Sequence, residues 1–304
     1  MWHEIKDSLL NGSIKALARG ISLVENDVPG SLDFLQGLQV PSVPVIGITG
    51  PPGAGKSTLT DALIKSIVDS GKKVAVLCVD PSSPFNLGAV LGDRIRMSQW
   101  YNHPLVFIRS LATRGSMGGL HPKILEVSDL CKAGGFDYII VETVGVGQSE
   151  IEITGLADIT IVVLVPEAGD EIQTMKAGLM EIADIFVVNK SDRPDAQNFV
   201  RHLRSMLAPA FHTKQVEIPI MQTVAMRREG VDALWEKILA YLGSGSYNKQ
   251  KVRLLAEKVY YLIMQERMKG VSKEEIKENI EQQMNRTDFN TYRFTQEYTE
   301  RLKQ

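Results

Sequence analysis

The stretch Gly50-Pro51-Pro52-Gly53-Ala54-Gly55-Lys56-Ser57 matches the complete G-x-x-x-x-G-K-[ST] motif of a phosphate-binding loop. The loop follows an apolar, β-branched run, Val43–Thr49, and precedes a helix-like segment, Ser57–Asp69. This strand–loop–helix order is the setting that the motif requires. Its glycines let successive backbone N–H groups turn toward a phosphate, and the N-terminus of the following helix adds partial positive charge. The motif therefore predicts a nucleoside triphosphate site rather than a glycine-rich turn without a ligand.

Three side chains at the end of this loop receive predicted roles. Lys56 is expected to reach the β- and γ-phosphates of the nucleotide. The hydroxyl of Ser57 is expected to ligate Mg²⁺. Thr58 continues the nucleotide-binding stretch into the helix. The loop alone does not say which base the nucleotide carries.

Length, charge and cysteine content restrict the class of protein. The chain of 304 residues carries a net charge of −2, which gives no argument for binding nucleic acid or a membrane surface. Its two cysteines, Cys78 and Cys131, do not suggest a disulfide framework, which favours a reducing compartment. No signal peptide is visible, and the longest apolar run, Ile159–Pro166, is too short to span a bilayer. We expect a soluble, cytoplasmic protein without a nucleic-acid or membrane partner.

Residues 41–243 alternate apolar strands with amphipathic helices. Several of the strands are continuous apolar runs, as expected for strands buried on both faces of a mainly parallel sheet. The pattern predicts an α/β, doubly wound domain whose ligand lies at the C-terminal ends of the strands. The candidate strands are Val43–Thr49, Lys73–Val79, Leu105–Ser110, Tyr138–Glu142, Thr160–Val165, Ile185–Asn189 and Ile218–Val224, and the later candidate helices are Lys123–Ala133, Glu171–Ala183, Asp195–Leu207 and Val231–Leu242.

Helical segments flank this domain on both sides. Residues 1–40 are predicted to form an N-terminal helical extension, and residues 244–304 a C-terminal helical arm that follows a Gly-Ser linker. The first helix of the arm carries an apolar seam, which must pack on the domain, on the N-terminal helices or on a second subunit. We favour a dimerisation arm and expect a homodimer. The seam consists of Val252, Leu255, Ala256, Val259, Leu262 and Ile263.

A second motif, Asn189-Lys190-Ser191-Asp192, follows the predicted strand Ile185–Val188 and distinguishes between bases. The carboxylate of Asp192 can accept from both the N1–H and the exocyclic N2–H₂ of guanine, whereas adenine offers no such pair of donors. Asn189 and Lys190 would shape and cover the pocket. The segment Thr223-Val224-Ala225 lies where such domains place a last base-contacting loop, with Val224 in the place of the usual serine. The nucleotide is therefore predicted to be GTP or GDP.

Acidic residues at the ends of two other strands predict the metal side of the site. Glu142 leaves the strand Tyr138–Val141 beside the phosphate loop, where it would contact Mg²⁺ or its waters. Ordinary small GTPases have Asp-x-x-Gly here; this chain keeps the glycine, Gly145, whose N–H could sense the γ-phosphate, but carries a longer acid. Asp80, at the end of the strand Lys73–Val79, is a further acid at this edge.

Hydrolysis needs an ordered water and compensation of the charge that develops on the γ-phosphate. The candidates for ordering the water are Asp93, Glu142 and Gln148. The candidates for charge compensation are Arg96 and Lys176. For each of them a surface ion pair is the alternative interpretation.

Four motifs in this order resemble the methylmalonyl-CoA mutase-associated GTPase family, which also has an older ArgK label. The resemblance covers nearly the whole chain, including its helical ends. Two segments depart from the family pattern: Gly119-Leu120-His121-Pro122, and Val224 in the last base loop. The four motifs are Val79-Asp80-Pro81-Ser82-Ser83-Pro84, Leu91-Gly92-Asp93-Arg94-Ile95-Arg96-Met97, Glu142-Thr143-Val144-Gly145-Val146-Gly147-Gln148-Ser149 and Asn189-Lys190-Ser191-Asp192.

The resemblance implies a set of site residues. Ser57, Asp80, Asp93 and Glu142 would surround Mg²⁺ and the γ-phosphate. Asp80–Met97 would contain the first switch. A further switch, Gly169-Asp170-Glu171-Ile172-Gln173-Thr174-Met175-Lys176, would couple the nucleotide state to a partner enzyme, with Asp170 and Lys176 as its polar members.

The resemblance also implies a function and a partner. The chain would be a GTP-hydrolysing chaperone, slow alone and stimulated by its partner, an adenosylcobalamin-dependent acyl-CoA mutase. It would gate the loading or exchange of adenosylcobalamin and protect the mutase, without itself binding cobalamin. Methylmalonyl-CoA mutase is the default partner, although isobutyryl-CoA and related mutases use similar proteins.

Two other functions share the nucleotide architecture. A nickel-type metallochaperone GTPase needs soft or imidazole ligands, but the two cysteines are isolated and the five histidines show no C-x-x-C or H-x-H pairing. An ATP-dependent small-molecule kinase linked to amino-acid transport is suggested by the older family label. Asp192 argues against ATP, because its carboxylate matches the donors of guanine.

Overall fold

The architecture comes from a computed structural model, which divides the chain into two compact units, Met1–Leu254 and Leu255–Gln304. The phosphate loop and the base-recognition motif both lie in the first unit. The structure describes residues 1–80, 97–113, 120–143, 149–168, 182–214, 218–244, 249–268, 271–284 and 289–301.

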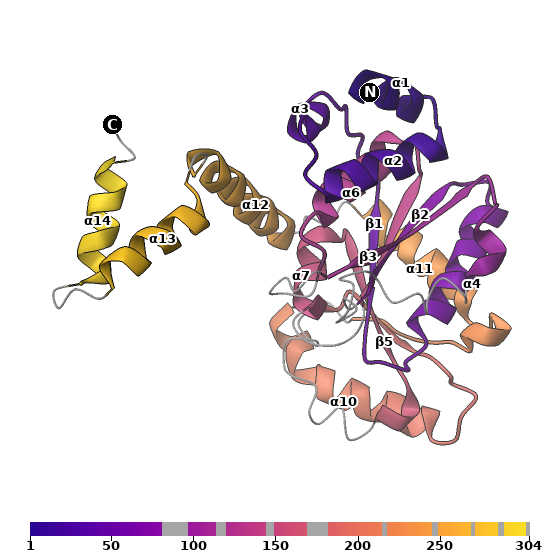
Figure 1. Cartoon of the computed structure of the whole chain (residues 1–304). Coiled ribbons are helices and arrows are strands. Elements are labelled where there is room, and N and C mark those ends of the chain that lie inside the picture. Colours follow the sequence, from indigo (N-terminus) through magenta and orange to yellow (C-terminus); the bar gives the residue numbers. More distant parts are fainter. Residues whose placement is uncertain are drawn as a thin grey trace. The chain divides into compact units, whose positions relative to one another are not determined.

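The first unit is built on a seven-stranded sheet in which every described strand pairing is parallel (Figure 1). The strand order is β3-β2-β4-β1-β5-β6-β7, so β1 lies at the centre between β4 and β5. All seven predicted strands are confirmed, and no strand end differs from its prediction by more than two residues. The strands are β1 (Val45–Thr49), β2 (Val74–Asp80), β3 (Val106–Ala112), β4 (Tyr138–Glu142), β5 (Ile159–Leu164), β6 (Ile185–Val188) and β7 (Ile220–Gln222).

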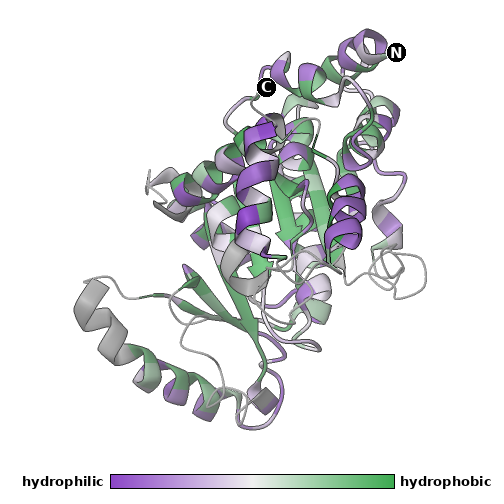
Figure 2. Cartoon of the chain, turned by 60° about the vertical axis from the view of Figure 1, so that its left-hand side comes forward, coloured by the Kyte–Doolittle hydropathy of each residue, from purple (hydrophilic) through white to green (hydrophobic). Residues whose placement is uncertain are grey.

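Both faces of the sheet are buried in its central part, because alternate residues of β1, β2 and β4 enter two separate hydrophobic cores. In β1, Ile46 and Ile48 belong to one core and Val45 to the other. Figure 1 places α4 and α11 on one side of the strands and α6 and α7 on the other, and Figure 2 shows the strands as the most hydrophobic part of the unit. These helices are α4 (Lys56–Asp69), α6 (Ile124–Ala133), α7 (Ser149–Leu156) and α11 (Val231–Gly243), with α10 (Ala196–Lys214) on the face of α4.

These helices confirm the doubly wound α/β prediction. The predicted helices Lys123–Ala133, Asp195–Leu207 and Val231–Leu242 are present as α6, α10 and α11. The predicted helix Glu171–Ala183 lies almost entirely outside the described residues. Three short 3₁₀ helices connect the larger elements: η1 (Ser98–Trp100), η2 (Pro166–Ala168) and η3 (Ala225–Arg227).

Three N-terminal helices share the second core with the sheet. They are α1 (Trp2–Leu10), α2 (Ile14–Glu25) and α3 (Ser31–Gln36). Leu9 and Leu17 are almost completely buried there, together with residues of β1 and β2. The side chain of Ser13 caps α2 by accepting from the backbone N–H of Ala16 at 3.2 Å. The N-terminal helical segment is thus part of the same compact unit as the nucleotide motifs.

The C-terminal part of the chain is helical. It contains α12 (Lys249–Arg267), α13 (Lys273–Gln283) and α14 (Thr291–Arg301). Ser272 caps α13 through a hydrogen bond from the backbone N–H of Glu275, and Phe294 is buried against the rings of Phe289 and Tyr298. Across all described residues, the helices fall short of the length and apolar character that a membrane crossing demands.

Candidate nucleotide-binding site

The phosphate loop connects the end of β1 to the start of α4, and two of its glycines have no room for a side chain. Gly50 and Gly55 have φ values of 139° and 89°, which favour glycine. A Cβ at Gly50 would lie 2.1 Å from the carbonyl oxygen of Val163 on β5. A Cβ at Gly55 would lie 2.4 Å from Nδ2 of Asn189. The loop is therefore shaped by close contact with β5 and with the segment that follows β6.

Lys56 begins α4 and is only 7% exposed. Its Nζ donates hydrogen bonds to the carbonyl oxygens of Gly50 (2.9 Å) and Pro51 (3.1 Å). The ammonium group is thus held inside the loop by the loop's own backbone. A phosphate in the loop would offer it charge-assisted hydrogen bonds, which are roughly twice as strong as neutral ones. This placement fits the predicted contact with the phosphates.

Ser57 and Glu142 are in direct contact, although 85 residues separate them in the sequence. Glu142 ends β4 and is 3% exposed. The Oγ of Ser57 donates to Oε1 of Glu142 at 2.6 Å, and Oγ1 of Thr60 donates to Oε2 at 2.8 Å. Hydroxyl and carboxylate oxygens are the hard ligands that Mg²⁺ takes. The chemistry of this pair therefore fits the predicted metal side of the site.

The remaining predicted metal and hydrolysis residues are not all placed. Asp80 ends β2, and Cys78 pairs with Glu142 in the parallel register, so the backbone of Asp80 reaches the same edge of the sheet. The side chain of Asp80 is outside the described part. Among the described residues, no group of three or more His, Cys, Asp or Glu side chains forms a metal cluster. Asp93, Arg96, Gly145, Gln148, Asp170 and Lys176 lie outside the described residues, as do most of the predicted switches.

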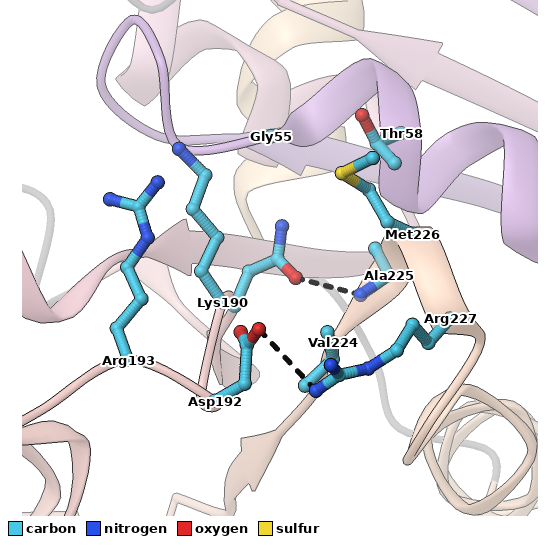
Figure 3. Close-up of a pocket in the computed structure, with 10 residues that line it drawn as sticks. Gly55, Thr58, Lys190, Asp192, Arg193, Val224, Ala225, Met226 and Arg227 are labelled. Carbon is cyan, nitrogen blue, oxygen red and sulfur yellow. Dashed lines mark hydrogen bonds and ion pairs between the residues drawn. The ribbon is translucent and has the colours of Figure 1, made fainter.

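A pocket of about 400 Å³ lies next to the phosphate loop, at the C-terminal ends of β6 and β7 (Figure 3). Its walls come from the start of α4 and from both segments predicted to contact the base, the Asn189–Asp192 motif and the loop at Val224 and Ala225. This is the position that parallel α/β sheets offer to a ligand. The pocket is lined by Gly55, Thr58, Asn189, Lys190, Asp192, Arg193, Val224, Ala225, Met226 and Arg227.

Asn189 joins the two halves of this pocket. It is 2% exposed, and its Nδ2 donates to the carbonyl oxygen of Ala54 in the phosphate loop at 3.0 Å. Its Oδ1 accepts from the backbone N–H of Ala225 and from Oγ1 of Thr223, each at 3.1 Å. The side chain therefore uses its donor on one loop and its acceptor on the other. It shapes the pocket through these fixed contacts.

Lys190 and Asp192 lie on the other side of the pocket. Lys190 has a φ of 56°, and its Nζ donates to the carbonyl oxygen of Gly53 at 2.8 Å. The carboxylate of Asp192 points at the guanidinium of Arg227, whose Nη2 lies 3.3 Å from Oδ2 (Figure 3). Nε of Arg227 also lies 2.9 Å from Oε1 of Glu229. The carboxylate expected to accept from guanine thus already faces one cationic group, the guanidinium of Arg227.

The last base loop keeps its shape without the usual serine at position 224. The backbone N–H of Val224 donates to the carbonyl oxygen of Glu229 at 3.0 Å, and that of Arg227 donates to the carbonyl oxygen of Val224 at 2.9 Å. These bonds close a tight turn around η3. The contact with Asn189 comes from the backbone N–H of Ala225, which a valine at position 224 leaves intact.

Four residues of the site were not anticipated from the sequence: Thr60, which contacts Glu142, and the pocket-lining residues Arg193, Met226 and Arg227. Thr60 could have been found, because it lies three residues after Ser57 and such spacing places two side chains on one helix face. Arg227 carried no signal, since an arginine in a polar loop is ordinary surface composition.

Cysteine and histidine show no arrangement typical of a soft metal site in the described part of the chain. Cys78 and Cys131 are both buried, and burial raises the pKa of the Cys131 thiol far above neutral pH. A protonated thiol is a poor metal ligand. His121 is 2% exposed, and its Nδ1 accepts from the backbone N–H of Lys123 at 3.0 Å. These residues offer no support for a nickel site.

Sequence comparison places the chain among GTPases. The family model described as methylmalonyl Co-A mutase-associated GTPase MeaB matches residues 17–278. A Pyrococcus horikoshii protein with a provisional GTPase assignment is 47% identical over 242 residues, which cover 77% of this chain and 76% of that protein. The GTPase ArgK of Escherichia coli is 36% identical, over 77% of this chain and 73% of the relative. A fused isobutyryl-CoA mutase of Cupriavidus metallidurans is 37% identical, over 78% of this chain but 23% of the much longer fused protein.

Structural comparison finds the same fold in two solved proteins. The crystal structure of an LAO/AO transport system kinase matches with a TM-score of 0.68 and 26% identity, over 100% of this chain and 98% of that one. The nickel complex of HypB from Helicobacter pylori matches with a TM-score of 0.50 at 19% identity, over 65% of this chain and 86% of that one, which shows a common fold alone. With the phosphate loop, the Ser57–Glu142 contact and the pocket at Asp192 in one site, the chain belongs to the methylmalonyl-CoA mutase-associated GTPase MeaB family.

Proposed function

We propose that this protein binds and hydrolyses GTP and acts as a chaperone for an adenosylcobalamin-dependent acyl-CoA mutase. It would gate the loading or exchange of adenosylcobalamin, protect the mutase, and work in the cytoplasm without binding cobalamin itself. The observation that carries the mutase partner is the fused isobutyryl-CoA mutase, in which a relative of nearly the whole GTPase unit is part of a mutase polypeptide. A fusion of this kind supports a functional contact between separate chains.

The residues of the site have distinct proposed roles. Lys56 binds the phosphates, Asp192 selects guanine, and Lys190 covers the base. Mg²⁺, when bound, supplies positive charge to the β- and γ-phosphates. Ser57 and Glu142 would hold it, together with Asp80 and Asp93, and their contact at 2.6 Å supports this assignment for the first two.

Hydrolysis is assigned to residues of the predicted switches and of the segment after β4. Asp93, Glu142 and Gln148 are the candidates for orienting the attacking water. Arg96 and Lys176 are the candidates for offsetting charge on the γ-phosphate, and Gly145 for sensing it. Asp170 and Lys176 would report the nucleotide state to the mutase. We expect slow hydrolysis by the protein alone and faster hydrolysis with the partner.

The mutase proposal is tested with purified proteins. We expect the chain to co-elute in size-exclusion chromatography with methylmalonyl-CoA mutase or isobutyryl-CoA mutase in the presence of a non-hydrolysable GTP analogue. The same mutase should raise the rate of phosphate release from GTP. The Asp192→Asn variant is the matched control, because weaker guanine binding should remove both effects. No co-elution and no stimulation with either mutase would contradict the partner proposal.

We also propose that the C-terminal helices mediate a homodimer. Leu255, Val259 and Ile263 lie at helical spacing on α12, and each leaves about half of its side chain exposed, at 47%, 54% and 54%. Burying an aliphatic side chain of this size stabilises an interface by about 1.5–3 kcal/mol relative to leaving it in water. The exposed seam supports a second copy of the chain as its partner.

The dimer is tested by light scattering. A chain ending at Gly245 is expected to be monomeric, and Val259→Glu in the full chain should dissociate the dimer, because it would bury an unpaired charge. Lys277→Glu, which changes an exposed charge on α13, is the control and should leave the dimer intact. A dimer of the truncated chain would refute the arm as the dimerisation element.

An ATP-dependent kinase is the second candidate, because a crystal structure that matches this chain over its full length is that of an LAO/AO transport system kinase. Competition between GTP and ATP for the pocket separates the two candidates. A preference for ATP would favour the kinase.

A further inference from the structure

Glu142 is a buried carboxylate with a hydroxyl donor on each of its oxygens. Oε1 accepts from Ser57 at 2.6 Å and Oε2 accepts from Thr60 at 2.8 Å. Thr60 is completely buried and Ser57 is 5% exposed. Both donors come from the first turns of α4, where residues three apart lie on one face of the helix. One face of α4 therefore donates a hydrogen bond to each oxygen of the carboxylate.

The two hydroxyls serve different purposes. Ser57 follows the phosphate-loop lysine, and its hydroxyl oxygen is the proposed metal ligand, while its proton is directed at Glu142. Thr60 lies one turn farther into the helix and is sealed from solvent, so its hydroxyl serves the carboxylate and not a ligand. Without it, the almost completely buried carboxylate would lose a hydrogen bond at Oε2. A buried acceptor that loses its partner is costly, and the cost is larger for a charged group.

The length of the acid at this position makes the second donor important. Glutamate has one more rotatable bond than the aspartate found in ordinary small GTPases. Holding that bond in one rotamer has an entropic cost. Thr60 is β-branched and has few rotamers of its own, so it is a rigid anchor for the longer side chain.

We propose that Thr60 is a positioning residue that holds the Glu142 carboxylate in the orientation required for Mg²⁺ and, through the metal, for retention of the guanine nucleotide. This inference rests on the proposed assignment of Glu142 to the metal side of the site. Residues that orient metal ligands typically change metal affinity by about ten- to one hundredfold when they are mutated. Thr60 would be a residue of that kind.

The test measures the release rate of fluorescent N-methylanthraniloyl-GDP from the full chain while free Mg²⁺ is varied with EDTA. In Thr60→Val, which keeps the shape but loses the hydroxyl, the Mg²⁺ concentration that half-maximally slows release should rise by about ten- to one hundredfold. Thr60→Ser should restore it to within about threefold of wild type, since the hydroxyl returns. In excess EDTA all three proteins should release the nucleotide at the same rate. That equality separates metal positioning from general damage.

The controls make the possible outcomes distinct. Thr160→Val removes a buried threonine near the N-terminal end of β5, which β1 separates from β4, and should leave the Mg²⁺ dependence unchanged. If Thr60→Val does not fold, Thr60→Ala provides the same measurement. A wild-type Mg²⁺ dependence in the hydroxyl-deficient variant, or equal shifts in the Val and Ser variants, would overturn the role of Thr60. If Glu142→Gln leaves the Mg²⁺ dependence unchanged, the metal assignment itself fails, and the inference fails with it.

Discussion

Lys56→Ala is expected to lower the affinity for GTP by at least about a hundredfold, or about 2.7 kcal/mol. The ammonium group lies inside the phosphate loop, where it donates to two backbone carbonyls at 2.9 and 3.1 Å. In the complex the same donors would face the β- and γ-phosphates. Hydrogen bonds to charged groups contribute about 1.5–3 kcal/mol each, and alanine removes them all. Isothermal titration calorimetry with GTP and GDP measures the loss.

The control for Lys56→Ala is a lysine on the same helix that faces solvent. Lys65 is exposed on α4 and pairs with Asp69 at 2.8 Å, an exposed ion pair worth less than about 1 kcal/mol. Lys65→Ala should bind GTP with wild-type affinity. Circular dichroism of the unliganded variants separates loss of the ligand contact from loss of the fold. Wild-type affinity in a folded Lys56→Ala protein would refute the phosphate-loop assignment.

Asp192→Asn is expected to weaken GTP binding by about ten- to one hundredfold while leaving ATP binding nearly unchanged. A carboxylate offers two acceptors to the N1–H and N2–H₂ of guanine. Asparagine offers one acceptor and turns a donor toward a donor. The discrimination between GTP and ATP should therefore fall by the same factor. Competition against a fluorescent guanine nucleotide measures both affinities in one experiment.

Arg227→Gln is the companion variant for this measurement. Guanine must compete with Arg227 for the Asp192 carboxylate, because Nη2 lies 3.3 Å from Oδ2 in the pocket. Asp192 and Arg227 are both well exposed, so their pair is worth at most about 1 kcal/mol. Removing the arginine should raise GTP affinity by at most about fivefold, in the opposite direction to Asp192→Asn. Unchanged GTP/ATP discrimination in Asp192→Asn would count against the base-pocket assignment.

Much of the fold follows from local sequence patterns. All seven strands were predicted, and several of them are continuous apolar runs, as expected for strands that are buried on both faces by the two hydrophobic cores. Their spatial order, with β1 between β4 and β5, was not predicted. It depends on which non-local pairs form, and no local pattern encodes that choice. Nor did the helical pattern of residues 1–40 show that Leu9 and Leu17 would share a core with the sheet.

In the candidate site, too, local motifs could be predicted from the sequence, whereas contacts between distant residues could not. The phosphate loop and the Asn189–Asp192 motif could be predicted, because in each of them the residues that contact the ligand are adjacent in the sequence. Thr60 and Arg227 were not, since each acquires its role from a partner far along the chain. Glu142 lies 82 residues from Thr60, and such a contact exists only after the sheet and α4 have packed. The three-residue spacing from Ser57 indicates that Thr60 shares a helix face with it, but not that Glu142 lies against that face.

The bridging amide of Asn189 has a consequence for ligand size. One side chain connects Ala54 of the phosphate loop to Ala225 of the base loop through bonds of 3.0 and 3.1 Å, so the two subsites keep a set separation. We expect this separation to fit the ribose that joins the base to the phosphates in a mononucleotide. A linked mononucleotide engages both ends after a single loss of translational freedom, whereas free guanine and free pyrophosphate each incur that cost separately. The affinity of the intact nucleotide should therefore exceed by orders of magnitude what either fragment achieves alone.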